Sequence, residues 1–185
     1  MKEQARLDLL ARRRAMAPEA RRQAADAIAL HLLAAPVVAR AKRVACYLSM
    51  PSEPGTVPLI AGLIDRSIEV VVPLSRDDRT LDWVAYDLES SLTTTPLGIP
   101  EPAGPSLGTD ALETCDVVVV PALAVDHAGH RLGRGAGYYD RALAGVRAPL
   151  CALVFTHELV PELPHEPHDV PVQMAVTPGG LFRVP

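Results

Sequence analysis

Three glycines at alternate positions, Gly133, Gly135 and Gly137, stand between an apolar run and a helix-like segment. The run Val117–Val120 consists of β-branched residues, which lose side-chain freedom in a helix and pack well in a sheet. It therefore predicts a strand that is buried on both faces. Tyr138–Leu143 is typical of the first turn of a helix. A glycine-rich turn between a strand and a helix can direct backbone amides at phosphate oxygens, so the spacing predicts an anion-binding loop.

Two arginines lie within the same turn. Arg131 and Arg134 offer planar donors that match phosphate or carboxylate. The dinucleotide pattern G-x-G-x-x-G is not matched, because Tyr138 stands where the third glycine would be, and the chain contains no Gly-Lys-Ser/Thr sequence. A flexible surface turn is the alternative interpretation, but the arginines favour a bound anion.

The N-terminal segment Lys2–Ala15 is predicted to be a helix. Leu7, Leu10 and Ala11 recur at helical spacing and are expected to form its apolar face. The basic run Arg12–Arg14 is interpreted as part of a solvated surface.

Helices and strands alternate over the rest of the chain. A helix is predicted from Pro18 and is expected to end at Pro36, and a short helix is predicted at about Pro58–Asp65. The further predicted strands are Arg43–Leu48, Glu69–Pro73, Leu81–Tyr86, Cys151–Phe155 and Gln173–Thr177. Ser90–Thr109 lacks periodicity and is expected to be a long loop, and Trp83 is expected in the core, with stacking on a ligand as the alternative.

This alternation predicts the α/β class, as a three-layer α/β/α sandwich formed by one domain over residues 1–185. In an open α/β sheet, the loops that leave the carboxyl ends of strands line the ligand crevice. The loop Ser49–Thr56 follows a predicted strand and is therefore expected to belong to the site.

Composition limits the class of protein. The chain has 185 residues, of which 49% are hydrophobic and 22% charged, and a net charge of −4, which does not favour a nucleic-acid-binding surface over the whole molecule. No apolar run is long enough to suggest a membrane span. Cys46, Cys115 and Cys151 are an odd set in apolar surroundings and are predicted to be reduced core residues of a cytoplasmic protein. A monomer is expected.

The segment RLGRGAGYYDR, at 131–141, follows VPALAVD, at 120–126. Together they resemble the signature of the 5-formyltetrahydrofolate cyclo-ligase, or methenyltetrahydrofolate synthetase, family. That signature is approximately P-G-L-A-F-D, a short loop, and R-L-G-x-G-x-G-Y-Y-D-R. Ala122 replaces the usual glycine, and Ala136 stands where the family often has glycine or lysine, but neither change removes a phosphate-facing amide. The resemblance also implies a fold similar to the sugar-phosphate isomerase and CoA-transferase group.

The resemblance implies an ATP site with magnesium. Lys2 and Arg134 are implied to be catalytic, with Lys2 neutralising charge on the transferred group and Arg134 holding the triphosphate. Asp140 and Asp169 are implied to hold Mg²⁺, a hard cation that favours oxygen ligands, although Asp140 is also a favourable carboxylate at a helix start. The implied ATP-binding residues are Lys2, Arg6, Arg131, Leu132, Gly133, Arg134, Gly135, Ala136, Gly137, Tyr138 and Tyr139.

The resemblance also implies a reduced-folate site, with or without a polyglutamate tail on the substrate. Its implied residues are Met50, Glu53, Gly55 and Tyr138, and Tyr139 is an alternative to Tyr138. Gly55 departs from the family, which more often has an acidic residue there, and Met50 is equally typical of core packing. The segment 98–102, GIPEP, resembles the family's G-I-x-E-P sequence along the substrate groove.

The implied reaction is the ATP-dependent cyclisation of 5-formyltetrahydrofolate to 5,10-methenyltetrahydrofolate, through a phosphorylated formyl group. Three alternatives remain: a nucleotide-binding or regulatory paralogue with another substrate, an RNA-binding accessory protein with a basic first helix, and a metal-dependent hydrolase. The histidine-rich ligand sets considered for the hydrolase are Asp126 with His127 and His130, and His165 with His168 and Asp169. Pro167 interrupts the spacing of the second set.

Overall fold

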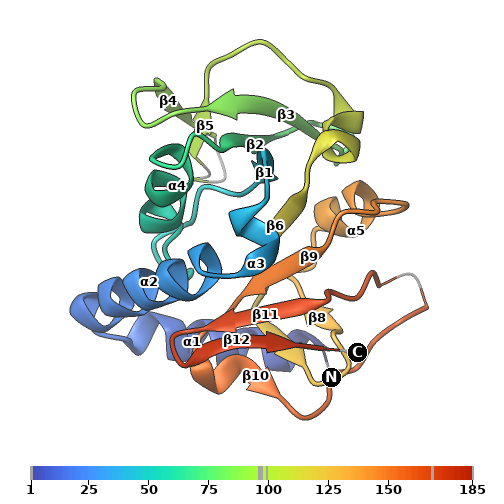
Figure 1. Ribbon diagram of the computed structural model, residues 1–185. Helices are drawn as coiled ribbons and strands as arrows, with labels where there is room; N and C mark the ends of the chain where they lie inside the picture. The colour runs from blue at the N-terminus through green and yellow to red at the C-terminus, as the bar shows by residue number, and fades with distance from the viewer. Residues whose placement is uncertain (1, 96–97, 99, 168, 185) are drawn as a thin grey trace.

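A seven-stranded sheet forms the centre of this computed structural model, which describes residues 2–95, 98, 100–167 and 169–184 (Figure 1). The strand order is β12-β11-β9-β6-β1-β2-β3. The strands are β1 (Arg43–Ala45), β2 (Glu69–Ser75), β3 (Leu81–Tyr86), β6 (Val117–Pro121), β9 (Leu150–Leu153), β11 (Met174–Thr177) and β12 (Gly180–Arg183).

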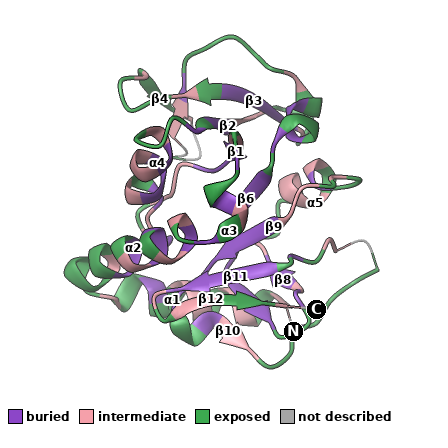
Figure 2. Cartoon of the chain, in the orientation of Figure 1, coloured by how far each residue is buried: buried purple, intermediate pink, exposed green. Residues whose placement is uncertain are grey.

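The inner strands β11, β9, β6, β1 and β2 are parallel, and the edge strands β12 and β3 are antiparallel to their neighbours. Val44 of β1 lies opposite Val70 of β2 on one side and Val117 of β6 on the other. All three valines are buried, as are the inner strands in general (Figure 2). Continuous apolar runs are required here because both faces of a parallel sheet are covered.

One face of the sheet is covered by α2 (Pro18–Leu33), α3 (Pro36–Ala39) and α4 (Val57–Ile64). Ile28 and Leu32 of α2 and Leu63 of α4 are fully buried against alternate residues of the strands, such as Val44 and Val119. Apolar residues recur every three or four positions along α2 and every second position along the strands, so both sets face the same core. Pro36 is the first residue of α3, and α2 ends earlier, at Leu33.

The opposite face is covered by the 3₁₀ helix η1 (Thr109–Thr114) and by the short helix α5 (Tyr138–Ala142). Leu112 and Leu143 pack on this side with Val71 and Val118. Trp83 is fully buried in the same cluster, so its expected place in the core is confirmed. Helical elements thus lie on both faces of one large, mostly parallel sheet, as the alternation of elements predicts.

The helix α1 (Lys2–Ala15) has the predicted bounds, but the predicted apolar face is wrong. Leu7 is 58% exposed, whereas Ala5 and Leu9 pack on Ala124 and Leu132. The small sheet that receives α1 has the order β10-β7-β8, formed by β10 (Leu159–Val160), β7 (Ala124–Asp126) and β8 (Arg131–Leu132). The loop expected after the β6 strand therefore contains two short strands, and these select the face of α1 that is buried.

The prediction that the run Arg12–Arg14 lies on the surface is wrong for Arg13. Its side chain is only 1% exposed. Its Nε and Nη2 donate to both oxygens of Glu158 at 2.7 and 2.8 Å, and Nη2 also donates to the Ala122 carbonyl at 2.6 Å. Its guanidinium lies 5.5 Å from the centre of the Phe155 ring. A buried arginine is tolerated here because a bidentate carboxylate and a carbonyl satisfy its donors.

Several element boundaries differ from the sequence predictions. β1 ends at Ala45 rather than Leu48, and Pro121 is the last residue of β6, where its missing N–H interrupts no further pairing. The expected loop Ser90–Thr109 contains a hairpin of β4 (Leu92–Thr94) and β5 (Pro100–Pro102). The strand β12, which was not among the predicted strands, follows β11 and pairs with it. Within the family-like segment 98–102, Ile99 lies outside the described residues.

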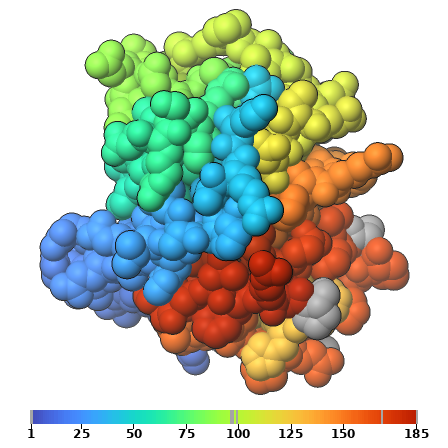
Figure 3. Space-filling model, in the orientation of Figure 1, coloured from blue at the N-terminus to red at the C-terminus, as the bar shows by residue number. Residues whose placement is uncertain are grey.

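In the space-filling view (Figure 3), the blue N-terminal helices lie beside the red C-terminal strands, and α2 contacts β11 and β12. All three cysteines are free and buried, in agreement with the sequence prediction. Burial raises the pKa of Cys46 to about 12 and that of Cys115 to about 11, so both thiols are protonated at neutral pH. Within the described residues, no helix combines the length and apolarity that a membrane span requires.

Replacement of Arg13 by methionine should lower the free energy of unfolding by about 3–5 kcal/mol, because Glu158 would remain as a buried, unpaired charge. Arg12→Met, at the exposed neighbouring position, is the control and should change stability by less than about 0.5 kcal/mol. Urea unfolding of the three proteins measures the difference. Equal stability of Arg13→Met and Arg12→Met would show that the buried pair does not hold α1 in place.

Candidate functional site

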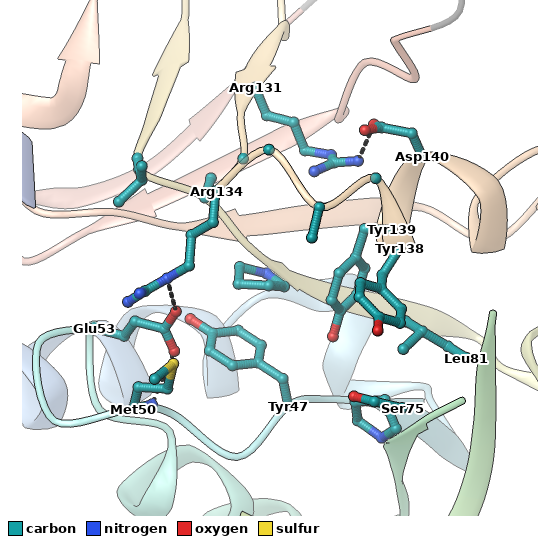
Figure 4. Close-up of a pocket in the computed structure, with 18 of the residues that line it drawn as sticks. Tyr47, Met50, Glu53, Ser75, Leu81, Arg131, Arg134, Tyr138, Tyr139 and Asp140 are labelled. Atoms are coloured by element: carbon teal, nitrogen blue, oxygen red, sulfur yellow. Dashed lines mark hydrogen bonds and ion pairs between the residues drawn. The ribbon is translucent and has the colours of Figure 1, made fainter. Parts of the chain in front are cut away.

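A cavity of about 320 Å³ lies at the carboxyl end of the parallel strands (Figure 4). The segments after β1 and β6 and the end of β2 form part of its wall, through residues such as Tyr47, Ala122 and Ser75. Leu81, at the start of the antiparallel strand β3, completes this side. The cavity thus lies at the edge of the sheet where the architecture predicts a ligand.

The order of the strands explains this position. From β1, the chain passes through α4 to β2 on one side, while β6 lies on the other side of β1. The connections that leave β1 and β6 therefore diverge and leave a crevice between them. Such a switch point is the usual ligand site of an open α/β sheet.

The glycine-rich loop forms the opposite wall, where Gly133, Gly135 and Gly137 line the cavity. Gly135 and Gly137 have φ values of 97° and 76°, a region that strongly favours glycine. A Cβ atom on Gly135 would lie 3.4 Å from Cζ of Arg6. The backbone conformation therefore favours glycine at both positions, and Gly135 also lies beside the cation of Arg6. The helix α5 after the loop has only five residues, so its dipole adds little.

Arg131 is anchored beneath the loop by Asp140. Its side chain is only 4% exposed, and Nη2 forms an ion pair with Oδ1 of Asp140. Burial lowers the pKa of Arg131, and the charge of Asp140 opposes that effect. Nε of Arg131 is buried and has no hydrogen-bond partner among the described residues. Asp140, in turn, lines the cavity with a carboxylate that is 33% exposed.

Arg134 and Glu53 connect the two walls of the cavity. Nε of Arg134 donates to Oε1 of Glu53 at 3.2 Å, and Oε2 of Glu53 accepts the backbone N–H of Met50 at 2.9 Å. The Glu53 side chain is 8% exposed, whereas that of Arg134 is 38% exposed. Nη2 of Arg134 also donates to Oγ of Ser52 at 3.4 Å, so the loop 49–56 and the glycine-rich loop, which are far apart in the sequence, meet through Arg134.

The basic residues of α1 reach this region from the side. Nε of Arg6 donates to the carbonyl of Gly133 at 2.9 Å. Nζ of Lys2 lies 3.0 Å from Oδ2 of Asp169 and 3.4 Å from Oε2 of Glu166. Burial opposes protonation of Lys2, but these two carboxylates outweigh it and raise the pKa of Lys2. Neither Lys2 nor Arg6 lines the cavity itself.

Most of the site residues predicted from the sequence gather around this cavity. Those that line it are Met50, Glu53, Arg131, Gly133, Arg134, Gly135, Ala136, Gly137, Tyr138, Tyr139 and Asp140. Leu132 is instead a buried residue of β8 that packs in the small cluster with Ala124. Gly55 is outside the lining, and a Cβ atom there would lie 3.0 Å from Cβ of Ala25. A side chain at position 55 would therefore require a small shift of α2.

The described residues contain no group of three or more His, Cys, Asp or Glu side chains arranged to hold a metal. Asp140 faces the cavity with Arg131, and Asp169 lies with Lys2. In the first alternative metal set, His130 contacts Asp126, but its ring stacks on that of His165 with centroids 3.7 Å apart. His168, from the second set, lies outside the described residues.

The carboxylate of Asp126 accepts several hydrogen bonds from neighbouring segments of the chain. Oδ1 accepts the backbone N–H groups of Ala128 and His130, both at 2.9 Å. Oδ2 lies 3.0 Å from the Leu163 N–H and from Nδ1 of His130. Burial works against the ionised form, but these hydrogen bonds outweigh it and hold the pKa of Asp126 below its usual range. The carboxylate therefore fixes the segments around residues 128 and 163.

Tyr47 is the main cavity residue that the sequence predictions did not identify. It lies two residues after β1 and is 4% exposed. Its hydroxyl, like that of Tyr139, is buried without a hydrogen-bond partner among the described residues. Burial and the charge of Glu53 raise the pKa of Tyr47 well above its ordinary value. The signal in the sequence was an aromatic residue with a polar end directly after a buried strand, within the segment interpreted as strand.

Comparison with known proteins gives one result over almost the whole chain. Residues 1–178 match the model of the 5-formyltetrahydrofolate cyclo-ligase family. The 5-formyltetrahydrofolate cyclo-ligase of Mycolicibacterium smegmatis is 39% identical over 184 residues, which cover 96% of this chain and 93% of the relative. The enzyme of the same name from Escherichia coli (strain K12) is 34% identical over 93% of this chain and 97% of its own.

A solved structure shares the fold. The 5,10-methenyltetrahydrofolate synthetase of Aquifex aeolicus superposes with a TM-score of 0.85 and 27% sequence identity. The superposition covers 99% of this chain and 92% of that structure. The sheet and the helices that cover it therefore belong to an architecture with a known example.

The way in which the free energy of unfolding changes with pH should reflect the ionisation of Asp126. Because the folded protein lowers its pKa, the ionised carboxylate stabilises the fold above the unfolded pKa of about 3.9, and this stabilisation is lost as the pH falls through the lower, folded pKa. Asp126→Asn should cost about 1–3 kcal/mol at pH 7, because an amide donor would face backbone donors. Its stability should also fall less steeply between pH 5 and the acid range, at roughly pH 2.

Urea unfolding of Asp126→Asn at both pH values measures these effects. Asp65→Asn is the control, since Asp65 is exposed and should leave both stability and its pH dependence nearly unchanged. If the free energy of unfolding of Asp126→Asn falls with pH as steeply as that of the unmodified chain, the ionised carboxylate does not have the stabilising role.

Proposed function

Because this chain belongs to the 5-formyltetrahydrofolate cyclo-ligase family, we propose that it converts 5-formyltetrahydrofolate to 5,10-methenyltetrahydrofolate and consumes ATP, with release of ADP and phosphate. The observation that carries the proposal is the cavity in which the loop Arg131–Asp140 faces Tyr47 and Glu53. One wall offers glycine amides and arginines to a triphosphate. The other offers an aromatic ring and a carboxylate to a flat, polar ring system.

The reaction needs ATP because the oxygen of an amide-like formyl group is a poor leaving group. In the proposed route, the formyl oxygen attacks the γ-phosphorus, and the bond between that phosphorus and ADP breaks. N10 of the folate then attacks the formyl carbon and loses its proton. The carbon–oxygen bond breaks last, and phosphate leaves with the former formyl oxygen.

Such a reaction requires positioning and charge stabilisation rather than a covalent nucleophile. Arg134, with the amides around Gly135, holds the triphosphate in this proposal. Arg6 contacts the loop through the Gly133 carbonyl and adds positive charge beside Gly135. Lys2, which forms an ion pair with Asp169, offsets negative charge on the transferred phosphoryl group in this proposal.

The residues present fit a magnesium ion that accompanies ATP. Mg²⁺ is usually held by one or two carboxylates together with phosphate oxygens and water, so a complete protein cage is not needed. Asp140 fits this requirement, because its carboxylate lines the cavity and is partly exposed. We assign Asp140 to the ion and retain Asp169 as the second candidate. When bound, the ion would offset negative charge on the phosphates.

A nucleotide-binding paralogue remains the second candidate, and Gly55 is the observation that favours it. The family more often has an acidic residue there, whereas Gly55 packs against Ala25. The RNA-binding alternative is weakened, since Arg13 is buried with Glu158 and only Arg12 and Arg14 of the basic run are exposed.

The proposed function is tested by mixing the purified chain with 5-formyltetrahydrofolate and MgATP and recording the longer-wavelength absorbance of the methenyl product. We expect product only when ATP is present. Binding of ATP without formation of product would reject the cyclo-ligase reaction and support the paralogue.

Gly135→Ala should raise the KM for ATP roughly tenfold, equivalent to about 1.4 kcal/mol. Alanine would have to adopt a left-handed backbone conformation there, with its methyl group in contact with the guanidinium of Arg6. Gly145→Ala is the matched control, because Gly145 has a similar φ of 79° but open space and lies outside the loop. If the two variants have the same KM for ATP, the loop does not hold the phosphates.

A further inference from the structure

Tyr47 carries a hydroxyl group that the proposed phosphate chemistry does not use. The ring is buried in the main core cluster, with Val44 and Leu59 among the members of that cluster. Yet the residue also lines the cavity, and its hydroxyl has no hydrogen-bond partner among the described residues. Buried hydroxyl groups are rarely left unpaired, and one at the wall of a ligand cavity indicates contact with the ligand.

The surroundings of this hydroxyl define what it can recognise. In Figure 4 the hydroxyl end of Tyr47 points toward the part of the cavity that holds Glu53 and Arg134. Burial and the charge of Glu53 raise the pKa of Tyr47, so the group is a neutral O–H donor at neutral pH. Glu53 is an acceptor, and each of its oxygens already takes one hydrogen bond, from Met50 or from Arg134. Each carboxylate oxygen can accept a second.

A carboxylate and an O–H donor on the same wall match a ring edge on which N–H groups adjoin a carbonyl. The pterin ring of a reduced folate has this edge: its 2-amino group and N3–H are donors, and its 4-carbonyl oxygen follows as an acceptor. We propose that Tyr47 donates its hydroxyl hydrogen to the 4-carbonyl oxygen of the pterin while Glu53 accepts from the adjacent N–H groups. This inference rests on the proposed function, and it makes Tyr47 a specificity-determining residue.

Tyr139 is the competing donor, because its hydroxyl is also buried without a partner among the described residues. It belongs to the glycine-rich wall, however, and its pKa responds to Arg131 as well as to Glu53, with burial as the main cause of its increase. Tyr47, on the wall that carries Glu53, is therefore the better match for the edge that Glu53 recognises.

The test compares two ligands and two chains. Isothermal titration calorimetry without ATP measures binding of 5-formyltetrahydrofolate and of its 4-amino-4-deoxy analogue, in which an amino group replaces the 4-carbonyl. The unmodified chain should prefer the 4-oxo ligand. Tyr47→Phe should weaken binding of the 4-oxo ligand about 3- to 10-fold and should change binding of the analogue less, so that the preference shrinks. The affinity for ATP should stay within about twofold, since the phosphates contact the other wall.

Tyr86→Phe is the matched control, because Tyr86 lies on β3 outside the cavity lining and should leave both affinities unchanged. An unchanged preference in Tyr47→Phe, or a preference lost in Tyr139→Phe instead, would overturn the assignment. Equal binding of both ligands by the unmodified chain would overturn it without any variant. The measurement requires no turnover. Folate binding without product formation would therefore reject the proposed reaction but not the contact between Tyr47 and the pterin.

Discussion

The buried ion pair between Arg13 and Glu158 is the contact on which the arrangement of the site depends. An unpaired charge in this position would be strongly destabilising, so α1 can occupy its place only with its basic side turned inward. The same helix face then brings Arg6 to the carbonyl of Gly133 and Lys2 to Asp169. A core interaction thus determines which cations of the first helix approach the glycine-rich loop.

The parallel sheet supplies the second constraint. Because β1 and β6 are neighbours whose connections diverge, the segments that leave them border one crevice. The helices on both faces fix the strands and leave the carboxyl end open. Residues from distant parts of the sequence, such as Glu53 and Arg134, then meet across the crevice without a dedicated domain to position them.

Local patterns predicted much of this molecule. The bounds of α1 and β3 agree with prediction, and most residues assigned to the site line one cavity, because a motif keeps its residues close together. The failures concern contacts that only the tertiary structure creates. Arg13 has the same local sequence context as its exposed neighbours, and its burial depends on Glu158, far along the chain. Tyr47 was interpreted as strand because nothing local indicates that pairing ends at Ala45.

The ion pair between Arg134 and Glu53 has a consequence for the order of events in the cavity. In the proposed reaction, each partner serves a different ligand: Arg134 the nucleotide and Glu53 the folate. A ligand that draws its own partner away weakens the pair, and the other ligand then meets a partner that is held less strongly. The two ligands should therefore bind cooperatively, and by thermodynamic reciprocity each should increase the affinity for the other by the same factor. The contact that links the two walls of the cavity would then favour the complete ternary complex.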